Sequence, residues 1–73
     1  MTEKNTIKIL FGDRLLELRQ EKGIGQVELA RQIDVSKGTI SLWENKLREP
    51  TLSNLLALAD FFEVTLDYLV GRE

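Results

Sequence analysis

The sequence predicts an all-α fold, a compact bundle of five helices in a single small domain of 73 residues. Apolar residues recur three and four positions apart in five separate segments, which is the spacing of one face of a helix. Three of these segments follow a residue whose side chain can cap a helix N-terminus, namely Ser36, Thr51 and Thr65. No segment shows the alternating pattern of a half-buried strand, so we expect no sheet.

The first helix is expected to begin between residues 6 and 11 and to end at Lys22. Its core-facing side is marked by apolar residues at i, i+4 and i+7, Phe11, Leu15 and Leu18. Gly23 supplies the C-terminal stop that glycine commonly provides. Gly12 lies inside the segment and weakens a helix by about 1 kcal/mol relative to alanine, which favours a helix start near that position.

Two short amphipathic helices joined at a tight corner are predicted next, Gln26–Ile33 and residues 37–45. Their buried stripes are marked by Leu29, Ala30 and Ile33 in the first and by Ile40 and Trp43 in the second. Asp34 and Val35 form the corner, where Asp34 is expected to adopt a positive φ, which aspartate tolerates better than most residues. Ala30 is small enough for two helices to cross closely. This is the helix-turn-helix pattern, whose second helix lies in the DNA major groove.

Two more helices are predicted after a loop at residues 46–50, in which Pro50 blocks helical continuation at Glu49. Thr51 is expected to cap the fourth helix, and Thr65 a short fifth helix. We expect the inner face of the fourth helix to carry Leu52, Leu55, Ala59 and Phe62. The apolar residues of the fifth helix are Leu66, Leu69 and Val70.

The composition excludes several classes of function. Zero cysteines exclude disulfides and thiolate metal sites, and zero histidines remove the commonest general base and nitrogen ligand. The twelve carboxylates are spread over helical faces as solvated surface, so we expect no enzyme, no metal and no cofactor. No apolar run approaches the ~18 residues of a membrane span, and the N-terminus lacks a signal peptide's hydrophobic region. We therefore expect a soluble, cytoplasmic protein.

The net charge of −2 argues mildly against DNA binding, because nucleic-acid-binding domains are usually basic. The charge is uneven, however. Residues 1–48 hold nine basic and seven acidic residues, a net charge of +2, whereas residues 49–73 carry −4. This asymmetry suits a domain with a DNA-contacting face and an acidic far face. Chance scatter in a short chain is the alternative.

Three blocks of sequence carry a family resemblance: FGDRLLELRQEKG before the corner, QVELARQIDVSKGTISLWEN across it and REPTLSNLLALADFFEVTLDYL after it. In this order and spacing they resemble the lambda-repressor/Cro-type helix-turn-helix family, also called the xenobiotic-response-element type in bacteria. The resemblance covers residues 11–70 and implies a lambda-repressor-like DNA-binding domain. Residues 1–10 are then an N-terminal extension or the start of the first helix, and residues 71–73 a C-terminal tail.

The resemblance also implies where DNA is contacted. It places Gln26 against a phosphate at the start of the second helix, where backbone N–H groups attract anions. The outward face of the third helix carries the residues expected near the bases, Ser36, Lys37, Gly38, Thr39 and Leu42. The loop that follows carries the other expected backbone contacts, Asn45, Lys46 and Arg48.

Three side chains near the third helix have competing interpretations. Lys37 is suited to donate to guanine O6 and N7. Leu42 stands where the resemblance implies a polar residue; it packs on a thymine methyl if it points outward and joins the core if it points inward. Trp43 suggests base stacking, but we expect a core position, because single-strand binders need several aromatic residues on a basic platform.

Two further features follow from the resemblance. Arg19 and Glu44 match a family pair that joins the first helix to the third and sets its angle. The alternative is two exposed charges, which describes most arginines and glutamates. Lys46 and Asp34 both stand where the family often has glycine.

We therefore expect a bacterial or phage transcriptional regulator that binds double-stranded DNA sequence-specifically, as a repressor and as a homodimer on a two-fold operator. A single recognition helix makes too few contacts for selective binding. The dimer interface is expected at the end of the fourth helix and in the fifth, at Phe61, Leu66, Tyr68 and Val70. The alternative is a protein-interaction module, antitoxin-like or a dimerisation domain, with weak or no DNA binding.

Overall fold

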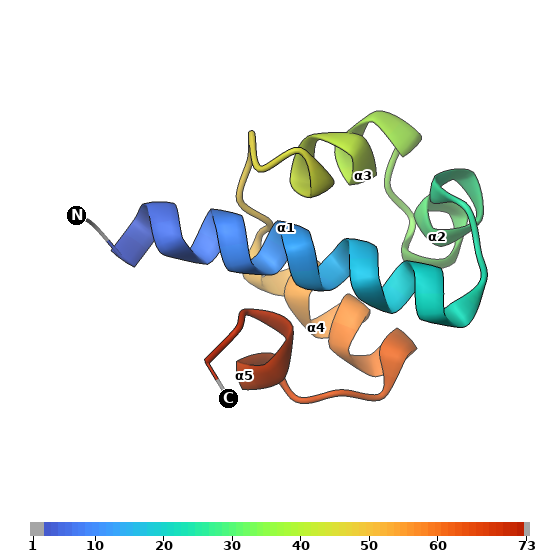
Figure 1. Cartoon of the computed structure of the whole chain (residues 1–73). Coiled ribbons are helices and arrows are strands. Elements are labelled where there is room, and N and C mark those ends of the chain that lie inside the picture. Colours follow the sequence, from blue (N-terminus) through green and yellow to red (C-terminus); the bar gives the residue numbers. More distant parts are fainter. Residues whose placement is uncertain (1–2, 73) are drawn as a thin grey trace.

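The computed structural model describes residues 3–72, and all the regular secondary structure in that range is α-helix. The helices are α1 (Glu3–Lys22), α2 (Gln26–Ile33), α3 (Lys37–Glu44), α4 (Leu52–Phe62) and α5 (Leu66–Leu69). Helix α1 runs the length of the molecule, with α2 and α3 on one side of it and α4 and α5 on the other (Figure 1). The predicted all-α fold of five helices is confirmed for the described residues. Residues 1, 2 and 73 of the predicted terminal segments lie outside them.

Helix α1 begins at Glu3, so the predicted start between residues 6 and 11 is wrong. Gly12 does not mark the helix start but lies buried within α1. A Cβ atom at Gly12 would lie 2.6 Å from the carbonyl oxygen of Trp43 and 3.0 Å from Cγ of Lys46. Glycine is therefore required here by the close approach of α3 to α1 and not by a helix end.

The core lies between α1 and the remaining helices. Its largest fully buried side chains are Trp43, Phe11, Leu15, Leu29, Ile40, Leu58 and Leu69. The rings of Phe11 and Trp43 meet edge to face, with centroids 5.8 Å apart, so the predicted core position of Trp43 is confirmed. The Trp43 indole N–H is buried without an acceptor among the described residues. Base stacking by this side chain is therefore not available to the folded domain.

The corner between α2 and α3 has the predicted geometry. Asp34 follows α2 with φ 62° and ψ 49°, in the left-handed region. Its conformation lets the backbone N–H of Val35 donate to the Ala30 carbonyl at 3.0 Å. Ala30 is itself buried at the crossing. The corner is therefore built by residues adjacent in the sequence.

Replacing Asp34 with glycine is expected to raise the free energy of unfolding by about 0.5–1 kcal/mol, because glycine adopts a left-handed backbone without strain. Thermal melts of the two proteins measure the change. Asp60→Gly is the matched control, since Asp60 is an exposed aspartate inside α4 and its replacement should lower stability slightly. A lower midpoint for Asp34→Gly would contradict the expectation.

The helix caps agree with the sequence pattern. The hydroxyl groups of Ser36, Thr51 and Thr65 accept hydrogen bonds from the backbone N–H groups of Thr39, Asn54 and Tyr68. The pattern did not predict Glu63, which follows α4 with φ 58°. The turn that it makes lets the Val64 N–H donate to the Ala59 carbonyl at 3.0 Å.

The predicted inner face of α4 is partly wrong. Leu58 and Ala59 are buried, and Leu55 and Phe62 pack against the core as expected. Leu52, the first residue of α4, is instead exposed. Leu58, three residues after Leu55, takes the core position in place of Leu52.

No helix formed by residues 3–72 is both long and apolar enough to cross a membrane.

Candidate nucleic-acid interface

The N-terminal half of α3 presents its outer side to solvent, away from α1 and the core (Figure 1). Lys37 and Gly38 are exposed, as is the capping residue Ser36. Thr39 is half-buried, and its Oγ1 lies 2.9 Å from Oγ of Ser36, so these two hydroxyl groups share a hydrogen bond. The first turn of α3 therefore offers a free ammonium group, a hydroxyl pair and an open backbone at Gly38.

Leu42 lies at the margin of the outward face. It is half-buried, whereas Ile40 and Trp43 on the inner face are fully buried. The side chain does not belong to the buried core, so the inward interpretation is wrong, and its contact with a thymine methyl stays a prediction. Its remaining exposed surface is apolar.

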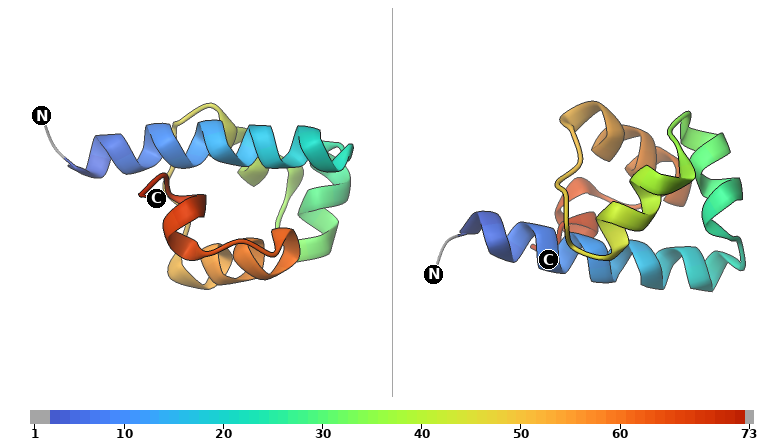
Figure 2. Two further views of the ribbon diagram at one scale, coloured as in Figure 1. Left: turned by 60° about the horizontal axis from the view of Figure 1, so that its bottom comes forward. Right: turned by 90° about the horizontal axis from the view of Figure 1, so that it is seen from above.

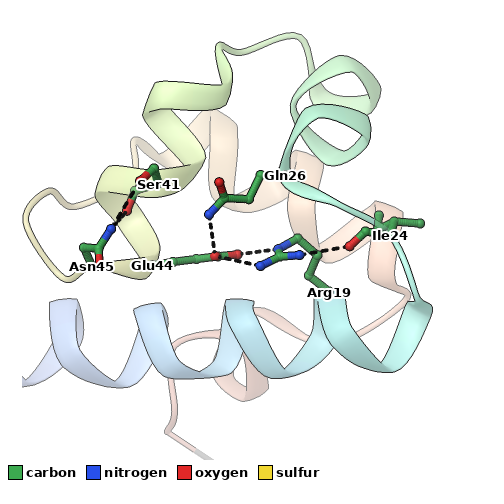
Figure 3. Close-up of polar contacts among 6 residues, drawn as sticks. All are labelled: Arg19, Ile24, Gln26, Ser41, Glu44 and Asn45. Atoms are coloured by element: carbon green, nitrogen blue, oxygen red, sulfur yellow. Dashed lines mark hydrogen bonds and ion pairs between the residues drawn. The ribbon is translucent and has the colours of Figure 1, made fainter.

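A hydrogen-bonded network attaches the C-terminal end of α3 to α1. Arg19 donates from Nε and Nη2 to the Glu44 carboxylate at 2.7 and 3.0 Å, and from Nη1 to the Ile24 carbonyl at 3.0 Å. Gln26 donates from Nε2 to the same carboxylate at 2.9 Å. Figure 3 shows Glu44 held between Arg19 and Gln26. The predicted pair between the first and third helices is confirmed, and the side chain of Gln26 extends it to α2.

The Arg19–Glu44 pair is well shielded from water, with side-chain exposures of 14% and 6%. The bidentate hydrogen bonds to Glu44 raise the pKa of Arg19 above its usual value, although burial acts in the opposite direction. Because the pKa of Arg19 is higher in the folded than in the unfolded state, its ionisation contributes fully to stability at any pH below the unfolded-state pKa. This contribution is lost only at extreme alkaline pH. Arg19 therefore stays charged over the pH range of living cells.

Gln26 begins α2, whose N-terminus has no side-chain cap, because Gly25 occupies the cap position. The first-turn N–H groups of α2 therefore lack the hydroxyl acceptor that the caps of α3, α4 and α5 provide. The Gln26 amide already donates to Glu44. A phosphate at this end of α2 can accept hydrogen bonds from the backbone N–H groups as well as from the Gln26 side chain.

The loop after α3 contains the other predicted phosphate contacts. Asn45 is exposed, but its Nδ2 donates to the carbonyl and hydroxyl oxygens of Ser41 at 2.8 and 3.2 Å (Figure 3). Lys46 has φ 65°, and its Nζ lies 2.8 Å from Oδ1 of Asp13. Arg48 is exposed. Asn45 and Lys46 thus stabilise the end of α3 and the loop in the free protein.

Asp13 and Gly12 are neighbours of Lys46 that the sequence pattern did not identify. Asp13 pairs with Lys46, and Gly12 makes room for the Lys46 side chain. The sequence signal for both residues is Lys46, because it occupies a position where the family often has glycine. A left-handed backbone at that residue directs its long side chain back towards α1.

The residues predicted for the dimer interface are half-buried. Phe61, Leu66 and Tyr68 pack against the core. The Arg14 guanidinium lies 3.7 Å from the centre of the Tyr68 ring and donates to the Tyr68 carbonyl at 3.0 Å. These contacts leave only part of each side chain available to a second molecule. The assignment stays a prediction.

A left-handed corner between two short helices, the second with a polar exposed first turn, defines a helix-turn-helix domain. The match to a family model agrees: residues 15–69 match the model HTH_3, described as helix-turn-helix. The chain belongs to this family, the xenobiotic-response-element or lambda-repressor type of helix-turn-helix protein.

Among curated relatives, the transcriptional regulator ImmR of Bacillus subtilis strain 168 is 36% identical over 63 residues, covering 86% of this chain and 50% of ImmR. The control protein C.MunI of a Mycoplasma species is 39% identical over 66 residues, covering 89% of each chain. For most of the curated relatives that it matches, this chain covers about half of the relative's length or less.

Solved structures agree with the assignment of the fold. The crystal structure of the phage P22 c2 repressor in complex with a synthetic operator superposes with a TM-score of 0.82 at 36% identity. The match covers 88% of this chain and 97% of the repressor chain. The lambda-repressor-like architecture expected from the sequence is therefore confirmed.

Proposed function

We propose that this chain binds double-stranded DNA sequence-specifically and represses transcription by occupying a two-fold operator as a homodimer. One observation carries the proposal: the exposed first turn of α3 is presented by a helix that Arg19 and Glu44 attach rigidly to α1. The similarity to a repressor solved with its operator supports it. Repression by occupancy needs no catalysis and no cofactor, and its site of action is the cytoplasm.

The proposal gives different roles to the two parts of the interface. In the major groove, Lys37 donates to guanine, the Ser36–Thr39 hydroxyl pair contacts a base or phosphate, and Gly38 allows close approach. The exposed edge of Leu42 packs on a thymine methyl group. The DNA backbone is held by the N-terminus of α2 at Gln26 and by the loop residues Asn45, Lys46 and Arg48.

Lys46 must change partner in this interface. In the free protein its ammonium group pairs with Asp13, and the pair is solvent-exposed, with side-chain exposures of 39% and 61%. An exposed pair of this kind contributes little to stability, so exchanging the carboxylate for a phosphate costs little. Arg48 needs no such exchange in the proposed complex.

Replacing Lys37 with alanine is expected to weaken binding to the preferred site by about 1–3 kcal/mol and to relax discrimination at one base pair, because a bidentate contact to guanine is lost. Competition binding with operator and random duplexes measures both effects. Arg48→Ala is the control, because loss of a phosphate contact should weaken binding to both duplexes equally. An equal loss on both duplexes for Lys37→Ala would identify Lys37 as a phosphate contact.

A protein-interaction module is the second candidate, favoured by the net charge of −2 and the few side chains suited to base recognition. A salt titration of binding to genomic and random duplex DNA separates the two functions. A DNA-binding domain should show log affinity falling with log salt, with a slope of about −0.9 per neutralised phosphate. Absence of binding at low salt would favour the interaction module.

A further inference from the structure

A groove lies between the C-terminal half of α1 and the segment that joins α4 to α5, and the proposed DNA contacts use none of its residues. Its volume is about 530 Å³, and it is open to solvent rather than enclosed. The residues that line it include Leu18, Glu21, Phe62, Glu63, Val64 and Tyr68. We call it the α1–α5 groove. Figure 2 shows α4, α5 and their connection together on one side of α1.

The floor of the α1–α5 groove is apolar. Leu18 is buried there, and the half-buried Phe62 and Val64 pack against the core. A smaller hollow that adjoins the groove extends along α1 to Lys22. An apolar side chain of another molecule can therefore leave water by packing on this floor.

Glu21 and Glu63 give the groove a negative charge. Both residues line it and both are exposed. Within residues 3–72, neither carboxylate takes part in a hydrogen bond or an ion pair. Lys22, the lysine next to Glu21, has its ammonium group 5.1 Å from the centre of the Phe61 ring. The two carboxylates are thus available to a cation from another molecule.

The backbone at Glu63 adopts a conformation that is unfavourable for a glutamate. Glu63 follows α4 with φ 58° and ψ 47°, in the left-handed region, which glycine adopts most easily at the end of a helix. Gly23 has the equivalent position after α1, with φ 72°. After α4 the chain instead has a side chain that lines the groove. A residue held in a costly conformation at a surface groove indicates a role for its side chain in binding.

We propose that the α1–α5 groove binds a short segment of a partner protein in which an arginine or lysine stands beside apolar side chains. The apolar side chains pack on Leu18 and Phe62, and the cation donates hydrogen bonds to the carboxylates of Glu21 and Glu63. Helix α3 lies on the opposite side of α1 from α4 and α5 (Figure 1). A bound segment therefore leaves the first turn of α3 exposed.

The same features disfavour other occupants. Small-molecule sites enclose most of the surface of their ligand, whereas this groove leaves one side of an occupant in solvent. A nucleic acid would bring phosphates against the carboxylates. A second copy seated groove to groove would bring the glutamates of both copies together. Of the lining residues named above, only Tyr68 is also predicted for the dimer interface.

The test begins with a displayed library of random heptapeptides, selected on the immobilised full chain. We expect the enriched peptides to share an arginine or lysine beside apolar residues. The most enriched peptide is then synthesised and titrated into isotope-labelled protein. The amide resonances that shift should belong to residues 62–65 and to Leu18 and Glu21. Absence of enrichment, enriched peptides without a basic residue, or shifts centred on another surface would overturn the proposal.

The double variant Glu21→Gln/Glu63→Gln tests the carboxylates with the same peptide. Its affinity should fall at least about tenfold, because two charge-assisted hydrogen bonds are weakened. Its thermal midpoint should match that of the parent protein, since both side chains are exposed. Glu49→Gln is the matched control, because Glu49 is an exposed glutamate in the loop before α4, outside the groove, and its affinity should be unchanged. Equal affinities of the double variant and the control would contradict the proposal.

Glu63→Gly separates binding from stability. Glycine relieves the left-handed backbone, so the thermal midpoint should rise by about 2–8 °C. Affinity for the peptide should nevertheless fall at least about threefold, because one carboxylate is lost. A loss of binding in a more stable protein cannot result from unfolding, and unchanged binding would overturn the role of Glu63. None of these measurements uses DNA, so their outcome does not depend on the proposed function.

Discussion

Replacing Glu44 with alanine is expected to lower the free energy of unfolding by about 3 kcal/mol, because it leaves the shielded Arg19 guanidinium without its carboxylate. This expected loss lies at the low end of the range for breaking a buried ion pair, because both side chains keep some contact with water. Gln26 loses the acceptor for its side-chain amide as well. In a domain of this size the midpoint of thermal unfolding should fall by about 12–24 °C.

The control for Glu44→Ala is Glu28→Ala, which removes the exposed contacts of Glu28 with Arg31 and Gln32 on α2. Exposed contacts of this kind contribute little, so its melting midpoint should be nearly unchanged. Glu44→Gln tests the charge separately, because glutamine retains one acceptor oxygen but not the negative charge. A melt of Glu44→Ala that coincides with that of Glu28→Ala would show that the network does not hold α3.

The second large effect is expected at Gly12. In Gly12→Ala the new methyl group would lie 2.6 Å from the Trp43 carbonyl oxygen, far inside van der Waals contact. Because that oxygen is a backbone atom, relief requires α3 to move away from α1. We expect a net loss of about 2 kcal/mol in the free energy of unfolding, after the gain of about 1 kcal/mol in helix propensity. Chemical denaturation measures the change.

Gly38→Ala is the matched control for Gly12→Ala, because both replace a helical glycine. A Cβ atom at Gly38 meets only Oγ of Ser36, at 3.7 Å, which is ordinary contact. Gly38→Ala should therefore raise stability by about 0.5–1 kcal/mol. Gly12→Ala should also reduce DNA affinity in the proposed function, since it displaces α3. Stabilisation by both substitutions would contradict the close approach of α1 and α3.

Both predictions concern the position of α3 relative to α1. Gly12 sets how closely the C-terminal end of α3 approaches α1, and Glu44 holds that end in place. Helix α3 also packs on α2 and buries Ile40 and Trp43 in the core. This packing and the contacts at the C-terminal end of α3 together set the orientation of its exposed first turn.

The sequence alone determined the elements between Gln26 and Glu44. The bounds of α2, the start of α3, the Ser36 cap and the left-handed Asp34 all depend on groups only a few residues apart along the chain. Periodicity, capping and turn chemistry act at that range and are therefore visible in the sequence. The resemblance to a known family supplied the Arg19–Glu44 pair, which residue spacing alone does not predict.

The tertiary structure decided the rest. In the folded domain α1 begins at Glu3, the side chain of Leu52 is exposed, and Lys46 forms an ion pair with Asp13. The fold also made Gly12 a contact residue, through atoms more than thirty residues further along the chain. Each outcome depends on which helices meet and how closely, and those distances are set by packing of the whole core. Local pattern contains no information on them, because the partners are brought together only when the bundle forms.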